Sequence, residues 1–183
     1  AGTPAFPVAV ILPNGGTSFS ALTDFKIIKE GNNWLALCIF LNGEGMLRLN
    51  FGPDITNTTP AYAILNLPGF LAKPRGLDIF EDKGNKYALI ANQTTGALTL
   101  LNFGPTYRNI PYPLNIEVPS AVNLYKVSMI RDCNIWHAFI SDQAQDSVYH
   151  LTFNRGLQAI PKRSMLPLVD GSGLKAVKDG NLY

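Results

Sequence analysis

Apolar residues occur along this chain in short runs separated by turn-forming residues, and not at the spacing of a helix. The run at 25–28 leads through Glu-Gly-Asn-Asn into a longer apolar run at 34–40, and Asn42-Gly43 separates that run from 46–51. An Asn-Gly pair between two apolar runs is the strongest short-range signal of a β-hairpin. No segment combines helical periodicity with capping residues. The pattern therefore predicts antiparallel strands joined by tight turns.

The same arrangement returns twice more, so we expect three successive sets of four strands. The expected strands are 25–28, 34–40, 46–51 and 62–67, then 77–80, 87–92, 97–103 and 114–118, and then 127–130, 136–141, 147–153 and 165–168.

Three independent sequence markers keep the same period. An apolar segment ends in Phe51, Phe103 and Phe153, which are 52 and 50 residues apart. An Asn stands two residues before a large aromatic, with a carboxylate just upstream, at 32–34, 85–87, 134–136 and 181–183. A proline precedes a short strand-like run at 4, 60, 111 and 161. A shared period in unrelated markers indicates a true internal repeat.

Four strands in about fifty residues match the blade of a β-propeller. The Gly-His and Trp-Asp marks of WD40 repeats are missing, and a kelch-like Gly-Gly pair occurs only at Gly15-Gly16. We predict an all-β fold of β-propeller-type four-stranded antiparallel blades, with about three complete repeats and partial blades at both ends. One propeller segment would cover 1–183, with units at about 4–59, 60–110 and 111–160 and a partial unit at 161–183.

The ends of the chain suggest that it is part of a longer one. Residues 173–183 echo 76–87, so a further unit begins and stops at its second strand. Three complete units also fall short of the four to eight blades that close a propeller ring. We expect further units in the same polypeptide; the alternative is a ring completed by several chains.

Composition excludes some partners. The 183 residues are 46% hydrophobic and only 15% charged, and 15 basic against 13 acidic side chains leave a net charge of +2. This balance predicts no nucleic-acid binding, and no apolar run is long enough for membrane insertion. Cys38 and Cys133 stand at different positions of different repeats, so two separate thiols are favoured over a disulfide.

Several phrases carry a resemblance to a known family. They are 131–140 (RDCNIWHAFI), 98–104 (LTLLNFG) and 55–60 (ITNTTP). They resemble the NHL-like β-propeller repeats of large secreted surface proteins of Bacteroidota, which are associated with gliding motility and type IX secretion. The resemblance implies an extracellular, cell-surface protein without assigned chemistry. Its partners would be neighbouring blades or domains, and surface glycans or the secretion and motility machinery.

One aromatic per repeat is the main candidate for ligand binding. Trp34, Tyr87 and Trp136, with Tyr183 as a fourth, follow the same Asn-containing turn in each unit. Repeated aromatics can stack on sugars, as in lectin-like propellers, but blade-on-blade packing also needs a large side chain at a fixed strand position. Packing is the favoured interpretation.

No catalytic, metal or cofactor site is predicted. The carboxylates Glu30, Asp82, Asp132 and Asp179 precede turns, where Asp and Asn bond to their own backbone. His137 and His150 have no metal-ligand spacing, and no phosphate-binding Gly loop is present. The expected inner strands contribute Lys26, Asp78 and Ser128, a poor set for a divalent cation.

Three residues are candidate glycosylation sites. Asn57 and Asn92 match the short N-glycosylation pattern. The resemblance to Bacteroidota proteins adds Ser147, since Asp-Ser-apolar is the O-glycosylation pattern of that group.

Near-equivalent units without a special polar cluster lead us to predict a non-enzymatic extracellular module, acting in adhesion or as a structural spacer of a large secreted protein. The alternatives are a carbohydrate-binding, lectin-like propeller or, as a weaker option, a lactonase-like propeller hydrolase.

Overall fold

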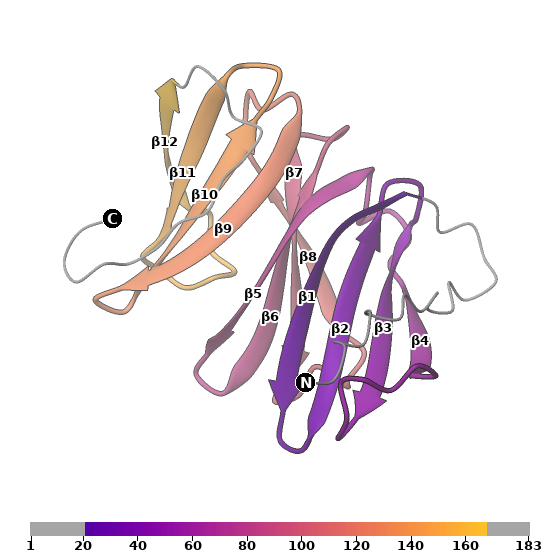
Figure 1. Cartoon of the computed structure of the whole chain (residues 1–183). Helices are drawn as coiled ribbons and strands as arrows, with labels where there is room; N and C mark the ends of the chain where they lie inside the picture. Colours follow the sequence, from indigo (N-terminus) through magenta and orange to yellow (C-terminus); the bar gives the residue numbers. More distant parts are fainter. Residues whose placement is uncertain (1–20, 168–183) are drawn as a thin grey trace, which may run out of the picture.

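The computed structural model describes residues 21–167, which form three four-stranded antiparallel sheets and, in that range, no helix (Figure 1). Blade 1 contains β1 (Leu22–Glu30), β2 (Asn33–Phe40), β3 (Gly45–Gly52) and β4 (Ala61–Asn66). Blade 2 contains β5 (Pro74–Asp82), β6 (Asn85–Asn92), β7 (Ala97–Gly104) and β8 (Tyr112–Glu117). Blade 3 contains β9 (Leu124–Asp132), β10 (Ile135–Asp142), β11 (Ser147–Phe153) and β12 (Lys162–Pro167).

Within each sheet the strands follow chain order, so each blade is an antiparallel meander. The predicted all-β, blade-type fold is confirmed. The partial units expected before residue 21 and after residue 167 lie outside the described residues.

The tight turns have local causes. Lys83 and Gly84 have φ values of 50° and 77°, and Cys133 and Asn134 have values of 44° and 69°. Positive φ at both central residues defines the type I′ turn, whose twist matches that of the flanking strands. The repeated Asn lies at the end of these turns, because Asn134 is the second turn residue of blade 3 and Asn85 is the first residue of β6.

The repeated Asn-Phe-Gly segment closes the third strand. The side-chain oxygens of Asn50 and Asn102 accept hydrogen bonds from the amides of Gly52 and Gly104, at 3.0 and 2.8 Å. Both glycines have φ near 70°, a conformation that glycine adopts without steric cost. The repeated phenylalanine, buried at 51, 103 and 153, points into the core.

The blades bury their faces against one another. On β2, the side chains of Leu35, Leu37 and Ile39 pack with Ala88 and Ile90 of β6. The other face of β6 packs against blade 3, through contacts that involve Leu89, Ala138 and Ile140. Because both faces of β6 are covered, its sequence is a continuous apolar run rather than an alternating one.

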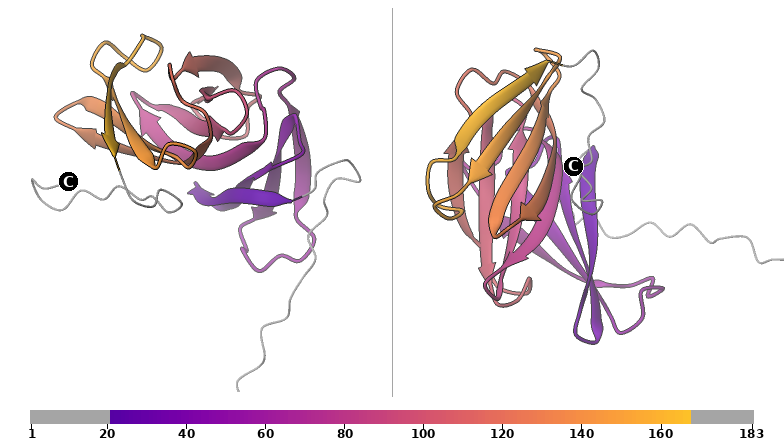
Figure 2. Two further views of the ribbon diagram at one scale, coloured as in Figure 1. Left: turned by 90° about the horizontal axis from the view of Figure 1, so that it is seen from above. Right: turned by 90° about the vertical axis from the view of Figure 1, so that its left-hand side faces the viewer.

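The first strands of the blades, β1, β5 and β9, lie next to each other as the inner strands (Figures 1 and 2). The pairing register shifts close to the start of each, between Leu22 and Asp24, between Pro74 and Gly76, and opposite β9 between Ile140 and Asp142. Such bulges redirect side chains and are frequent next to functional sites. The polar residues discussed next follow these bulges.

Candidate functional site

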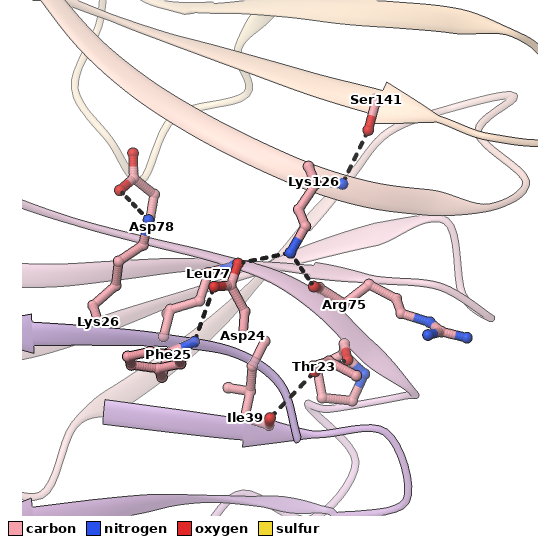
Figure 3. A network of polar contacts seen from close by, with 11 residues as sticks. Thr23, Asp24, Phe25, Lys26, Ile39, Arg75, Leu77, Asp78, Lys126 and Ser141 are labelled. Atoms are coloured by element: carbon pink, nitrogen blue, oxygen red, sulfur yellow. Dashed lines mark hydrogen bonds and ion pairs between the residues drawn. The ribbon is translucent and has the colours of Figure 1, made fainter. Parts of the chain in front are cut away.

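A cluster of charged side chains lies along the inner strands. The third residues of β1, β5 and β9 are Asp24, Gly76 and Lys126, and the fifth residues are Lys26, Asp78 and Ser128. Equivalent positions thus carry different side chains, and opposite charges meet between blades. We call Asp24, Lys26, Asp78 and Lys126 the axial cluster (Figure 3).

The Asp24 carboxylate is bonded to both other blades. Its Oδ2 atom lies 3.1 Å from Lys126 Nζ of blade 3 and accepts the amide of Leu77 in blade 2, also at 3.1 Å (Figure 3). Lys126 Nζ also donates to the carbonyl oxygen of Arg75 at 3.4 Å, and the Lys126 amide donates to Ser141 Oγ at 3.0 Å. Asp24 therefore connects the inner edges of three blades.

Asp78 makes the corresponding contacts one blade further on. Its Oδ1 atom lies 3.5 Å from Lys26 Nζ of blade 1, and its Oδ2 atom accepts the amide of Met129 in blade 3 at 2.7 Å. The side chains of the axial cluster are between 19% and 35% exposed. They are thus ordered by the protein but still open to solvent.

The cluster has the chemistry of a polar binding site. Its carboxylates accept and its ammonium groups donate hydrogen bonds, which suits a ligand with many hydroxyl groups. In residues 21–167 no group of three or more His, Cys, Asp or Glu side chains is placed to hold a metal ion. The prediction from Lys26, Asp78 and Ser128 missed Asp24 and Lys126, because the expected inner strands began after them.

The three aromatic candidates do not occupy one equivalent position. Trp34 pairs with Lys29 and Trp136 with Arg131, whereas Tyr87 pairs with Phe80, one step further along. Because strand side chains alternate between faces, Tyr87 points to the opposite side of its sheet. The expectation of one equivalent aromatic per blade is corrected in this respect; a ligand-binding role for these residues stays a prediction.

The environments of these aromatics differ accordingly. Tyr87 is 8% exposed and its ring stacks on Phe80 at 5.4 Å between centroids. The Trp136 ring lies 4.6 Å from Phe80 and is covered on another side by the Arg131 guanidinium at 5.7 Å. Trp34 belongs to a different apolar cluster and has Lys29 Nζ at 5.4 Å.

The carboxylates before the turns connect blades. Glu30 of blade 1 accepts the Tyr107 amide of blade 2 at 2.9 Å, and its other oxygen accepts the Thr106 hydroxyl at 2.5 Å. Asp82 of blade 2 lies 3.7 Å from the Arg131 guanidinium of blade 3. The sequence predicted that these carboxylates bond to the backbone of their own turns. Their partners in the next blade lie far along the chain, so a local sequence pattern does not reveal them. Asp179 lies outside the described residues.

The two histidines meet across a hairpin. His137 Nδ1 lies 2.9 Å from His150 Nε2, and Ser164 Oγ lies 3.3 Å from the other ring nitrogen of His150. Burial, and then the charge of His137, lower the pKa of His150 from its ordinary value of 6.5. Counting residues back from the hairpin turn would have paired these strands, although neither histidine stands in a known motif.

The candidate glycosylation sites differ in exposure. The Asn57 amide nitrogen donates to the Phe51 carbonyl at 3.1 Å. Asn92 is 1% exposed, with its amide bonded to Thr99 Oγ1 at 2.9 Å, and Ser147 is also 1% exposed.

Cys38 is buried and Cys133 exposed, and both are free thiols. Within residues 21–167 there is no helix of the length and apolarity needed to cross a membrane.

The fold and the axial cluster define a class: a β-propeller-type protein with a polar site at the inner strands. No protein-family model matches the chain, and no curated protein matches it. Solved structures do share its fold. An α-L-arabinofuranosidase of Podospora anserina, solved in complex with cellotriose, is 15% identical with a TM-score of 0.60. It is matched over 82% of this chain and 52% of its own length.

Two further structures match in the same way. The catalytic domain of an α-L-arabinofuranosidase of Coprinopsis cinerea is 14% identical, with a TM-score of 0.58 and 77% of this chain covered. An exo-β-1,3-galactanase of Phanerochaete chrysosporium with β-1,3-galactotriose is 12% identical, with a TM-score of 0.56 and 82% covered. The chain spans 48% and 38% of these two, so it corresponds to about half or less of each relative.

These comparisons contradict two of the predictions. The chain was expected to be a non-enzymatic adhesion or spacer module and not an enzyme, but the structures that share its fold are glycoside hydrolases. The physical reason for the error is that the unlike charged residues of the axial cluster come together only when blades stack. The relation to NHL-like Bacteroidota repeats and the extracellular location stay predictions.

Proposed function

We propose that this protein is a carbohydrate-active propeller protein that binds a saccharide at the axial cluster, with glycoside hydrolysis as its reaction class. The observation that carries the proposal is the placement of Asp24 and Asp78, two carboxylates from adjacent inner strands, in a fold shared with glycoside hydrolases. The solved relatives hold cellotriose and β-1,3-galactotriose, which supports a saccharide as the ligand.

The chemistry of the cluster fits this ligand. A saccharide presents hydroxyl groups that donate to carboxylates and accept from ammonium groups, and the axial cluster offers both within a half-buried site. Glycoside hydrolysis uses carboxyl groups on both sides of the scissile bond. Asp24 and Asp78 each lie beside a lysine ammonium group, at 3.1 and 3.5 Å, which fixes the positions of the two carboxylates.

The test is a screen of the purified protein against arabinofuranosides, β-1,3-galacto-oligosaccharides and cello-oligosaccharides. Binding is followed by calorimetry and released sugar by chromatography. Asp24→Asn and Asp78→Asn should each reduce turnover at least a hundredfold, because one interaction needed in the transition state is lost. Asp146→Asn, in an exposed turn, is the matched control and should leave turnover unchanged.

Both aspartates also bond to neighbouring blades, so thermal unfolding of each variant is measured in parallel. A variant that stays folded with full turnover would contradict the proposal. So would a protein that neither binds nor cleaves any saccharide of the panel.

A further inference from the structure

The two interfaces between the described blades are built from equivalent parts but are filled differently. In the first, the loop after β7 inserts Tyr107, four residues beyond Phe103, and only 4% of this tyrosine is exposed. Its hydroxyl donates to the carbonyl oxygens of Phe80 and Tyr87, at 3.1 and 3.2 Å. Burial raises the pKa of Tyr107 well above its usual range, so the hydroxyl keeps its proton.

Blade 1 also holds this loop from outside. The Arg48 guanidinium, on the fourth residue of β3, donates to the carbonyl oxygens of Tyr107 and Asn109, at 2.7 and 2.9 Å. Glu30 adds the bonds to Thr106 and Tyr107 and an ion pair with Arg108 at 3.7 Å. Tyr107 therefore fills this part of the space between blades 1 and 2, and blade 1 is hydrogen-bonded to its loop.

The second interface lacks these parts. Four residues beyond Phe153 stands Leu157, which is shorter than tyrosine and has no hydroxyl, and Gly156 replaces Thr106. The fourth residue of β7 is Leu100, which cannot donate to the loop as Arg48 does. A cavity of about 480 Å³ opens at this place, within the usual range for small-molecule sites. Its lining includes Asp82, Arg131, Trp136, Phe153, Arg155 and Leu157.

The charges of this cavity favour an anion. Lys83, Arg131 and Arg155 contribute three positive charges, and Asp82 contributes one negative charge, which lies 3.7 Å from Arg131. Arginine guanidinium groups bind carboxylates through two parallel hydrogen bonds. One arginine can keep its contact with Asp82 while the other, exposed on the loop, meets a ligand.

A neutral amide completes the lining. The Trp136 ring forms part of the wall, with its Nε1 atom buried. The Asn134 side chain, bonded to Arg131 at 3.0 Å, offers further groups for hydroxyls.

We propose that this cavity beside Leu157 binds the uronate residue of an acidic saccharide, with the Arg155 guanidinium on its carboxylate and Arg131 held next to it by Asp82. The saccharide part of this inference rests on the proposed function, while the carboxylate part rests on the cavity's own charges. The site is distinct from the axial cluster, because it lies at the turns that follow β5 and β9 and at the loop after β11.

The experiment measures binding of galacturonate and glucuronate oligosaccharides by calorimetry, against neutral galactose and glucose oligosaccharides of the same length. Acidic saccharides should bind at least tenfold more tightly. Leu157→Tyr, which places the plug of the first interface into the second, should weaken acidic binding at least tenfold without lowering the melting temperature. Arg155→Gln should weaken it by a similar factor.

Three outcomes would overturn the inference: unchanged acidic binding in Leu157→Tyr, equal affinity for neutral saccharides, or equal affinity for inorganic phosphate, which would mean anion binding only. The matched control Tyr107→Leu alters the first interface and should leave acidic binding intact.

The two proposals fail separately. Asp24→Asn and Asp78→Asn should abolish turnover but keep uronate binding. An unmodified protein that binds uronate but cleaves no saccharide would leave this cavity assigned and contradict the proposed function. An unmodified protein that cleaves a saccharide but does not prefer uronate would leave only the axial cluster.

Discussion

The Asp24 carboxylate of blade 1 meets the Lys126 ammonium group of blade 3 at 3.1 Å, although a whole blade separates them in the chain. The contact depends on Gly76, the third residue of β5 between them. A Cβ atom at position 76 would lie 2.7 Å from the Tyr125 carbonyl oxygen and 2.8 Å from the Lys126 Cα atom. Only glycine allows β5 and β9 to approach this closely.

Gly76→Ala should therefore destabilise the protein by about 1–3 kcal/mol, because two backbones must move apart. Urea unfolding followed by tryptophan fluorescence measures the change. The control is Gly84→Ala, where a Cβ meets open space and only the positive φ of 77° opposes the substitution, at a cost of about 1 kcal/mol. If the two variants lost the same free energy of unfolding, the close approach of β5 and β9 would not be what excludes a side chain at position 76.

Tyr107→Phe should lower the free energy of unfolding by about 0.5–1.5 kcal/mol. The variant keeps the ring in the first interface but removes the donor to the carbonyl oxygens of Phe80 and Tyr87. Tyr112→Phe, at a side chain that is 72% exposed, should change the stability by much less. A loss no larger than that of Tyr112→Phe would argue against the hydroxyl as an anchor.

Stability should fall as the pH is lowered below 6.5. The pKa of His150 is lower in the folded protein than its ordinary value of 6.5, chiefly through burial, so the unfolded chain binds more protons in this window. The stabilisation is complete above pH 6.5 and is lost as the pH falls towards the lowered pKa. Melting temperatures between pH 7.5 and 5 measure it, and His150→Gln should flatten the profile; an equally steep profile in that variant would contradict the assignment.

The two thiols should react at very different rates. Cys133 is exposed, whereas burial keeps Cys38 out of solvent and raises its pKa to about 11. Because the thiolate is the reactive form, iodoacetamide should label only Cys133 in the folded protein and both cysteines in urea. Mass spectrometry locates the label, and Cys133→Ser should abolish the fast reaction. Rapid labelling of Cys38 without denaturant would contradict the buried placement.

Local patterns in the sequence were sufficient to predict the strands and their grouping into blades. Hairpin turns, alternating apolar runs and the Asn-Phe-Gly segment act over a few residues, so a single repeat already shows them. The register of each strand was less certain. Tyr87 and Trp136 follow similar turns, but a one-residue difference sends Tyr87 to the opposite face, and only the observed pairing reveals this.

Contacts between blades could not be predicted from the sequence. Glu30 with Tyr107, Asp24 with Lys126, and the open cavity beside Leu157 each join residues from different blades. The sequence by itself determined the all-β repeat, because strand and turn preferences are local. Tertiary structure decided where charge gathers, because stacking sets unlike residues of equivalent positions side by side.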